Sequence, residues 1–348
     1  MKRIAVIAGD GIGVDVTCEA LKVLRRVNDL LGKKLEFVEF DWGAEKYLRD
    51  GVTLPEGALE MLRNEFDAIF MGAMGDPRIP DMRHAADILL GIRFGLDLYA
   101  NVRPVRPLHE KLCPLKEVSL DQINFTVFRE NTEGAYAGVG GAFKKGTADE
   151  VAVQEEIHTR KGVQRIIERA FEFARARGLK RVCMSDKSNV MQYAGDLWQR
   201  AFKEVASHYP EMEASHLYID ALTLQMVRRP YDFQVIVTNN MFGDIVTDLG
   251  AALQGGLGMA ASANINPRVT SMFEPVHGSA PPFAGKNVAN PMGAILTASM
   301  MLEYLGFAEA AKAVEQAVVQ CINENETTQD IGGPLGTREV GDAVVGRL

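Results

Sequence analysis

The feature that most constrains the fold is a regular alternation of short apolar, strand-like runs with amphipathic helical segments. Strand-like runs at 2–8, 34–40 and 67–73 enclose helical patterns at 14–31 and 54–66. A strand–helix–strand–helix–strand order needs crossover connections, so it predicts a parallel sheet covered by helices. The chain of 348 residues is long enough for about two domains.

The alternation continues through the middle and the end of the chain. Neither an internal repeat nor a low-complexity linker interrupts it, which favours two closely packed domains over two separate ones. We expect strands within 123–130, 150–159, 179–189 and 233–240, and helices over 159–178, 243–253, 291–305 and 308–323.

Composition and charge exclude several classes of protein. A net charge of −8 argues against a nucleic-acid surface, which needs clustered Lys and Arg. The four cysteines are far apart and form no CxxC pair, so no zinc or thioredoxin-type motif is expected. The N-terminal apolar run is too short for a signal peptide, and no stretch approaches the roughly 20 apolar residues of a membrane span. We therefore expect a cytoplasmic protein.

The first strand runs into a glycine-rich turn, "IAVIAGDGIG", that invites comparison with a dinucleotide-binding fingerprint. Gly9 and Gly11 fit the G-x-G-x-x-G pattern, but Val14 stands at the third glycine position. Asp10 would also place a negative charge among amides that should face a pyrophosphate. Acidic residues near position 39 could bind a ribose, so spacing alone does not exclude the Rossmann interpretation. The pattern favours a tight strand-to-helix turn that needs glycine dihedrals.

The segment "VTNNMFGDIVTDLG" places two carboxylates on one face of a helix. Asp244 and Asp248 are four residues apart, a spacing at which like charges destabilise a helix slightly. One explanation is the helix dipole, which tolerates carboxylates near the N-terminus. The other is a divalent cation, because Mg²⁺ takes one or two carboxylates together with substrate and water.

Other segments carry side chains suited to an anionic substrate. Arg93, Arg103 and Arg106 lie close in sequence, and Arg129 follows another strand. Arginine binds planar carboxylates in a bidentate manner, although any single arginine is more often only solvated. Tyr136, Lys187 and the rigid loop "FEPVHGSAPPFAGKNVANP" add candidates for proton transfer and for nucleotide binding.

Taken together, these motifs identify a resemblance that covers essentially the whole chain. The segments "GDGIG", "LDLYANVRP", "RENTEG", "DKSN", "NNMFGDIVTDLGAAL", "FEPVHGSAP" and "ANP" occur in that order. In this respect the chain resembles the metal-dependent β-decarboxylating dehydrogenases, which act on 3-isopropylmalate, isocitrate, homoisocitrate, tartrate or D-malate. The resemblance implies a two-domain α/β fold that is not a Rossmann fold. Residues 1–98 and 251–348 would form a large domain with most nucleotide contacts, and 99–250 a second domain with the dimer interface and metal site.

The resemblance also implies a role for individual residues. Tyr136 would act as general acid and Lys187 as base, with Arg93, Arg103 and Arg129 on the malate carboxylates. A homodimer would share its active sites, with Asp220 contributed by the neighbouring subunit to the Mg²⁺ or Mn²⁺ site of Asp244 and Asp248. The NAD-binding residues would be Ile12, His277, Gly278, Ser279, Ala280 and Asn290.

The chain departs from the family in its cofactor loop. NAD-using members have an aspartate after "GSAP" that binds the adenine ribose, and NADP-using isocitrate enzymes have Lys-Tyr there. This chain has Pro282 and Phe283 instead. No cation lies between His277 and Lys286, so NAD is the expected cofactor, although Arg338 could reach a 2′-phosphate.

A second departure concerns the substituent on C3 of the substrate. Isocitrate enzymes bind the third carboxylate with a serine and an asparagine, where this chain has Asp87 and Leu89. A carboxylate facing a carboxylate disfavours isocitrate and homoisocitrate. Leu89 and Leu90 match the apolar contacts to an isopropyl group, so 3-isopropylmalate is the expected substrate and leucine biosynthesis the expected setting. The length of "RIPDMRHAADILLGIR" keeps tartrate or D-malate as the alternative.

A non-enzymatic alternative is a regulatory subunit, because some oligomeric isocitrate dehydrogenases contain silent paralogues. Such subunits lose part of the catalytic set. Here the whole set of arginines, tyrosine, lysine and aspartates is present, which favours an enzyme.

Overall fold

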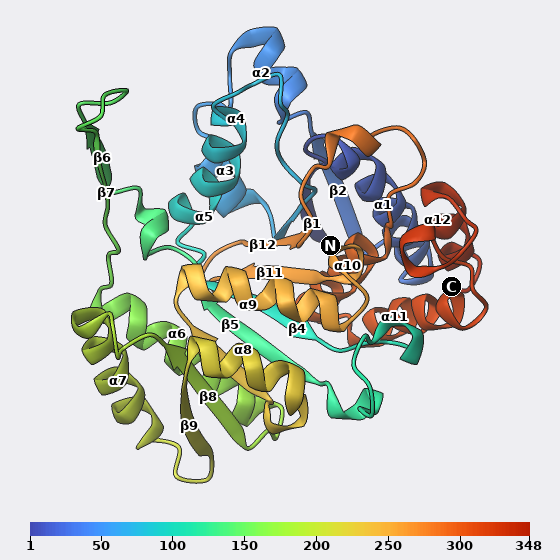
Figure 1. Cartoon of the computed structure of the whole chain (residues 1–348). Coiled ribbons are helices and arrows are strands. Elements are labelled where there is room, and N and C mark those ends of the chain that lie inside the picture. Colours follow the sequence, from blue (N-terminus) through green and yellow to red (C-terminus); the bar gives the residue numbers. More distant parts are fainter. The chain divides into compact units, whose positions relative to one another are not determined.

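The computed structural model describes all residues from Met1 to Leu348 and divides them into two compact units. Unit 1 comprises residues 1–98, 103–120 and 251–348, and unit 2 comprises residues 99–102 and 121–250. Both ends of the chain therefore belong to unit 1, and the middle of the sequence forms a second body (Figure 1).

Unit 1 is built on strands in the spatial order β2-β1-β3-β12-β11. The pairs β1–β2, β1–β3 and β3–β12 are parallel, which confirms the sheet predicted from the N-terminal alternation. Only β11 and β12 pair in antiparallel fashion. The strands are β1 (Lys2–Ile7), β2 (Leu35–Phe40), β3 (Ala68–Met71), β11 (Ala261–Ile265) and β12 (Ser271–Pro275).

The helices of unit 1 cover this sheet. Helix α10 is buried on nearly all sides and packs against α1, α11 and the strands β11 and β12. The longer helices are α1 (Ile12–Leu30), α2 (Ala44–Asp50), α3 (Ala58–Glu65), α10 (Met292–Tyr304), α11 (Ala308–Asn323) and α12 (Thr337–Val345).

The connection that follows β3 contains a short irregular helix. It runs from α4 (Arg83–Ala85) through a π-helical turn (Ala86–Leu90) into α5 (Gly91–Gly95). Ile88 and Ile92 anchor it, because both are fully buried in a hydrophobic core with Trp42, Leu62 and Met71. π-helical turns often occur at functional sites.

Unit 2 contains the parallel strands β5-β10-β8-β9, with β4 beside β5. Its strands are β4 (Ala100–Val105, of which residues 100–102 belong to the unit), β5 (Phe125–Glu130), β8 (Arg181–Asp186), β9 (Glu213–Tyr218) and β10 (Val235–Thr238). Its helices are α6 (Arg160–Ala176), α7 (Gln192–Ala206), α8 (Ile219–Arg228) and α9 (Asn240–Leu253), the last ending in unit 1.

A two-stranded antiparallel arm extends from unit 2 (Figure 1). It consists of β6 (Gly140–Phe143) and β7 (Val151–Gln154), and every residue of both strands is exposed. The expected strand at 150–159 is therefore shorter than predicted, and its partner β6 was not predicted. Short 3₁₀ turns complete the fold at Glu110–Leu112, Leu120–Gln122, Ala135–Ala137, Pro230–Asp232, Leu257–Met259, Pro281–Phe283 and Gln329–Ile331.

Residues 103–120 belong to unit 1, whereas the expected boundaries placed them in the second domain. Their contacts explain the difference. The Arg106 backbone amide donates to Gln254 at 2.9 Å, the Arg106 side chain pairs with Glu315 at 2.5 Å, and Lys111 donates to Asn325 at 3.0 Å. None of the helices has the length and apolar character to cross a membrane.

Candidate active site

Polar side chains cluster at the carboxyl ends of three strands in unit 2. β5 ends at Arg129 and Glu130, β10 is followed by Asn239 and Asn240, and β8 is followed by Lys187. Because β5, β10 and β8 are parallel, these ends lie along one edge of the sheet. Open α/β sheets bind their ligands at that edge.

Arg129 is the centre of a connected group at this edge. Its guanidinium is buried, donates to Asn240 Oδ1 at 2.9 Å and pairs with the Asp244 carboxylate. Helix α9 approaches closely because residue 243 is glycine: a Cβ there would lie 2.5 Å from Arg129 Cγ. The sequence "NNMFGD" thus brings the carboxylate on α9 onto the arginine at the end of β5.

Tyr136 joins the same group from the turn that follows β5. Its hydroxyl donates to Asp244 Oδ2 at 3.0 Å, and the Arg129 guanidinium lies 5.1 Å from the centre of its ring. Burial raises the pKa of the Tyr136 phenol; the positive charge of Arg129 opposes this rise and the negative charge of Asp244 adds to it, and the net shift is upward. The hydroxyl therefore keeps its proton over the whole neutral range, as a general acid must.

Asp244 and Asp248 lie one turn apart on α9, and both remain accessible to solvent. The Asp244 side chain is 44% exposed even though Arg129 and Tyr136 each engage one of its oxygens. Each carboxylate oxygen has a second lone pair, so Asp244 can still coordinate a cation. Hard oxygen donors of this kind fit Mg²⁺ or Mn²⁺.

Lys187 and Asp220 form a separate pair in unit 2. Lys187 Nζ lies 2.6 Å from Asp220 Oδ1 at the start of α8, and this hydrogen bond lowers the pKa of the Asp220 carboxyl. Neither unit by itself groups three or more His, Cys, Asp or Glu side chains at metal-binding distance. Asp220 therefore does not form a metal-binding cluster with Asp244 and Asp248 of the same unit.

The other two predicted arginines belong to unit 1 and are both buried. Arg93 Nη2 donates to Glu274 Oε1 at 2.6 Å, and the same oxygen accepts from Asn264 at 2.8 Å. Burial alone would raise the pKa of Glu274, but the positive charges of Arg93 and, more weakly, Arg103 outweigh it and lower the pKa. Glu274 thus holds Arg93 in place, a role that the sequence motif "FEP" did not suggest.

The predicted cofactor loop packs against the glycine-rich turn within unit 1. The Ile12 backbone amide donates to Ser279 O at 2.8 Å, and a Cβ on Gly11 would lie 2.1 Å from that oxygen. Further along, the Gly285 amide donates to Asp15 at 2.8 Å. Gly11 is required here because the two backbones touch, and Ile12 and Ser279 lie side by side.

His277 is the one buried side chain of this loop with an unpaired nitrogen. Its Nδ1 lies 3.1 Å from Gly278 O, whereas its Nε2 is buried without a partner. Burial lowers the pKa of the His277 imidazole, so the ring is neutral near pH 7. With Nδ1 donating, Nε2 is an acceptor that a ligand's N–H group would satisfy.

Ala280 and Asn290 have conformational or structural roles in the loop. Ala280 adopts a left-handed backbone conformation with φ of 36°, directly before the turn Pro281–Phe283. The Asn290 side chain accepts from the Met292 amide at 3.0 Å, where α10 begins, and donates to Asp330 at 3.1 Å. Its contact with a cofactor stays a prediction.

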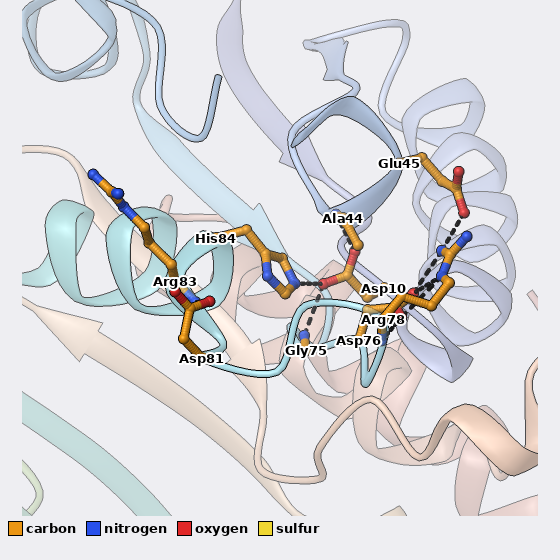
Figure 2. A network of polar contacts seen from close by, with 9 residues as sticks. All are labelled: Asp10, Ala44, Glu45, Gly75, Asp76, Arg78, Asp81, Arg83 and His84. Atoms are coloured by element: carbon orange, nitrogen blue, oxygen red, sulfur yellow. Dashed lines mark hydrogen bonds and ion pairs between the residues drawn. The ribbon is translucent and has the colours of Figure 1, made fainter. Parts of the chain in front are cut away.

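The turn at Gly9–Gly13 does not present its aspartate to a ligand (Figure 2). Asp10 is buried and accepts from the amide of Ala44 at 2.6 Å and that of Gly75 at 2.7 Å. Its Oδ2 also lies 3.0 Å from His84 Nε2. The turn is therefore a structural junction.

The residues predicted to meet the C3 substituent lie in the π-helical turn. Leu89 is half-buried and packs against the hydrophobic core, and Leu90 is also partly exposed. Asp87 accepts from Thr53 Oγ1 at 3.1 Å and from Arg83 Nε at 3.4 Å. Side chains of the same chain, Thr53 and Arg83, thus hold the Asp87 carboxylate.

Three residues of unit 1 have roles that the sequence did not predict: Glu274, His84 and Asp10. Glu274 belongs to the motif "FEPVHGSAP", but only its ion pair with Arg93 reveals its role. His84 lies 74 residues from Asp10 in sequence, and no local pattern links them.

Known proteins of similar sequence identify the family. The family "Isocitrate/isopropylmalate dehydrogenase" matches residues 3–344. A 3-isopropylmalate dehydrogenase of Thermobifida fusca is 45% identical, with 99% of this chain and 97% of the relative covered. One of Corynebacterium jeikeium is 46% identical, with 99% of each covered.

A solved structure agrees at the level of the fold. The isocitrate dehydrogenase of Methylococcus capsulatus superimposes with a TM-score of 0.89 at 35% identity, covering 100% of this chain and 99% of that one. The predicted α/β fold of this family is thereby confirmed. With the family match over nearly its whole length, the chain belongs to the isocitrate/isopropylmalate dehydrogenase family.

Proposed function

We propose that this protein oxidatively decarboxylates 3-isopropylmalate with NAD and a divalent cation. The observation that carries the proposal is the connected group of Arg129, Tyr136 and Asp244. In this group the arginine can bind a substrate carboxylate, the tyrosine can donate a proton, and the aspartate can bind a metal ion. The relatives named 3-isopropylmalate dehydrogenase support the choice of substrate. A regulatory subunit would be expected to lack part of this group.

The residues divide the work between binding and proton transfer. Arg129 in unit 2, and Arg93 and Arg103 in unit 1, supply guanidinium groups for substrate carboxylates. Asp244 and Asp248 would hold Mg²⁺ or Mn²⁺, which would supply a Lewis acid for the C2 oxygen, and the loop of His277 would hold NAD, which would supply the hydride acceptor. Lys187 takes the proton of the C2 hydroxyl.

Tyr136 completes the reaction on the substrate. Loss of CO₂ from a 2-oxo acid with a β-carboxylate leaves an enolate, which must gain a proton at C3. The Tyr136 hydroxyl is protonated at neutral pH and lies beside the metal-binding carboxylate. It is therefore the proton donor in this proposal.

We further propose that two chains share each active site. Lys187 and Asp220 are paired with each other, so a subunit that contributes one of them contributes both. This refines the expectation from the family resemblance, which named Asp220 alone. The exposed apolar side chains of the arm, Phe143, Val151 and Val153, suit a second copy as their cover.

Subunit complementation tests the shared site. Lys187→Met and Tyr136→Phe homodimers should each be nearly inactive, and mixing them under exchange conditions should restore activity in the hybrids. Each hybrid dimer would contain one site with both mutations and one with neither. The specific activity of the hybrid dimer should therefore approach half that of the wild-type dimer. Absence of any recovery, with subunit exchange verified by mass spectrometry, would contradict a shared site.

The C3 side of the substrate favours an alkyl group over a hydroxyl. Thr53 and Arg83 both donate to Asp87 Oδ2 and hold this carboxylate at the turn. Leu90 is a partly exposed apolar side chain of the same turn. Leu90 and the relatives named 3-isopropylmalate dehydrogenase support 3-isopropylmalate over tartrate.

NAD is the proposed cofactor because the loop offers no dedicated phosphate site. Phe283 is exposed in the turn where NAD-using relatives carry an aspartate. Arg338 is held beside the loop, since its amide and its Nε both donate to Asn287 Oδ1, at 2.9 and 3.3 Å. If Arg338 binds a 2′-phosphate, Arg338→Ala should lower kcat/KM for NADP alone.

A substrate panel tests the function as a whole. Purified protein should form NADH from 3-isopropylmalate in the presence of Mn²⁺ or Mg²⁺ and lose this activity with a chelator. D-malate, tartrate, isocitrate and homoisocitrate should each give a lower kcat/KM. Highest kcat/KM with tartrate or D-malate would overturn the substrate, and no turnover with any of the five would overturn the enzyme.

A further inference from the structure

The buried carboxylate of Asp10 joins three segments of unit 1 that are distant in sequence (Figure 2). Its Oδ1 accepts from the amide of Ala44, the first residue of α2. Its Oδ2 accepts from Gly75 in the connection after β3 and lies 3.0 Å from His84 Nε2. A buried carboxylate is stable only with such partners, so these contacts fix the three segments relative to the glycine turn.

The N-terminus of α2 packs closely against the Asp10 carboxylate. Residue 43 is glycine, and a Cβ there would lie 2.7 Å from Asp10 Oδ1. Its lack of a side chain means that α2 has no N-cap of its own, and Asp10 provides the carboxylate at that helix terminus instead. On the surface, Arg78 pairs with Glu45 and with Asp76, which joins the same two segments from outside.

His84 connects this junction to the residues that read the substrate. It is fully buried, its ring stacks on Tyr47 of α2, and it lies in α4 directly before the turn Ala86–Leu90. Its Nε2 faces the Asp10 carboxylate, which can only accept, so Nε2–H is the donor in this contact. The position of His84 therefore fixes where the backbone enters the turn that carries Leu89 and Leu90.

On its other side, the junction borders the cofactor loop. Asp10 is followed by Gly11 and Ile12, which touch Ser279 through backbone atoms. A Cβ on Gly75 would lie 3.2 Å from Ser279 Oγ, so the second segment approaches the same residue. The Asp10 carboxylate thus fixes two features. One is the pair of segments that touch Ser279 of the cofactor loop, and the other is the start of the turn that carries Leu89 and Leu90.

We propose that Asp10 and His84 are positioning residues for substrate specificity, which set the distance between the turn carrying Leu89 and Leu90 and the cofactor loop. The inference rests on the proposed function, because it assigns Leu89 and Leu90 to the C3 substituent. Neither side chain touches the substrate in this proposal. Asp10 and His84 act by holding the helical segment from His84 to Arg93 in one position.

The test compares two substrates that differ only at C3. D-malate lacks the substituent, so the ratio of kcat/KM for 3-isopropylmalate to that for D-malate reports the C3 contacts alone. His84→Leu removes the donor and keeps bulk, whereas His84→Gln places an amide donor within reach of Asp10. We expect His84→Leu to lower the ratio about tenfold, mainly through KM for 3-isopropylmalate, and His84→Gln to stay within about threefold of wild type.

Matched controls separate positioning from general stability. Arg78→Gln removes an exposed ion pair between the same segments and should leave the ratio unchanged. The proposal is overturned if folded His84→Leu protein keeps the wild-type ratio or loses activity equally on both substrates. It is also overturned if His84→Gln behaves like His84→Leu.

A second measurement does not depend on activity. Hydrogen exchange of residues 84–93 should be faster in His84→Asn, whose amide stops short of Asp10, than in His84→Gln or wild type. Equal exchange in all three proteins would overturn the positioning role. Because this readout needs no substrate, it remains decisive if His84→Leu does not fold. Failure of the proposed function would instead appear as wild-type protein without turnover.

Discussion

Asp10 in unit 1 and Asp244 in unit 2 are the same side chain in two opposite situations. Asp10 is 5% exposed, and its partners are two backbone amides and a buried histidine. The Asp244 side chain is 44% exposed, and its partners are the functional groups of Arg129 and Tyr136. The first carboxylate is buried and its contacts are to the fold, whereas the second is exposed and lies among groups suited to chemistry.

This difference shows where a sequence motif supports structure and where it supports chemistry. Both aspartates lie in glycine-containing motifs, "GDGIG" and "FGDIVTD". The glycines serve close approach in each case, of Gly11 to Ser279 and of Gly243 to Arg129. Only the exposure of the neighbouring carboxylate distinguishes a junction from a reaction site. The following predictions test that contrast, from the largest effect to the smallest.

The largest effect is expected from Lys187→Met. The variant removes the base for the C2 hydroxyl, so kcat for 3-isopropylmalate should fall by about 10³-fold or more. Steady-state NADH formation measures this. Lys180→Met is the matched control, because Lys180 is an exposed lysine just before the same strand, β8. Comparable losses in both variants would argue against the role of Lys187.

A smaller loss is expected from Tyr136→Phe. Without the phenol, protonation of C3 must come from water, and kcat should fall by about 10²-fold. Because burial and then Asp244 raise the pKa of Tyr136, wild-type kcat should show no alkaline loss from this group below its ordinary pKa of 10.0. An alkaline fall of kcat at a pH well below 10 that disappears in Tyr136→Phe would contradict the raised pKa of Tyr136. Near-wild-type kcat in a folded Tyr136→Phe protein would contradict the assigned acid.

Asp10→Ala should act on stability. The change leaves two backbone amides and His84 without their acceptor, and each orphaned buried group costs about 1–3 kcal/mol. We expect the free energy of unfolding to fall by about 3 kcal/mol or more, measured by urea denaturation. Glu45→Ala, at the exposed end of the same network, should cost less than about 1 kcal/mol. Equal effects would remove the distinction between junction and surface.

The smallest effect concerns pH. Burial lowers the pKa of His277 below its ordinary 6.5, so the unfolded state binds a proton before the folded state does. The contribution to stability is therefore complete above pH 6.5 and declines as pH falls toward the folded pKa. Urea denaturation at a series of acidic pH values should show a shallower decline in His277→Gln than in wild type. An unchanged slope would indicate that His277 titrates normally.

The contrast also explains how much the sequence could predict. The alternation of strands and helices in the first 73 residues predicted the parallel sheet, because each element carries its own periodicity. Arg129, Tyr136 and Asp244 were predicted together because the family motifs list them, and the hydrogen bonds in unit 2 connect them. Residues that act at strand ends are visible as motifs because the chemistry restricts the residue types there.

The junction around Asp10 could not be predicted in the same way. His84 and Gly75 are 74 and 65 positions from Asp10, and their pairing depends on the path of the chain after β3. The pairing of Lys187 with Asp220 was equally invisible, because α7 and β9 separate them in the sequence. Buried polar networks are specified by tertiary contacts, and a single sequence shows only their members.

The most direct test of the account is kcat for 3-isopropylmalate in Asp244→Asn, measured beside Asp10→Asn. Asparagine keeps one acceptor for Arg129 but weakens cation binding, so Asp244→Asn should lose at least about 10²-fold in kcat with a change in unfolding free energy below about 1 kcal/mol. Asp10→Asn should show the reverse balance, a clear loss of unfolding free energy with kcat reduced far less than in Asp244→Asn. Near-wild-type kcat in a folded Asp244→Asn protein would contradict the central claim that this carboxylate serves the chemistry.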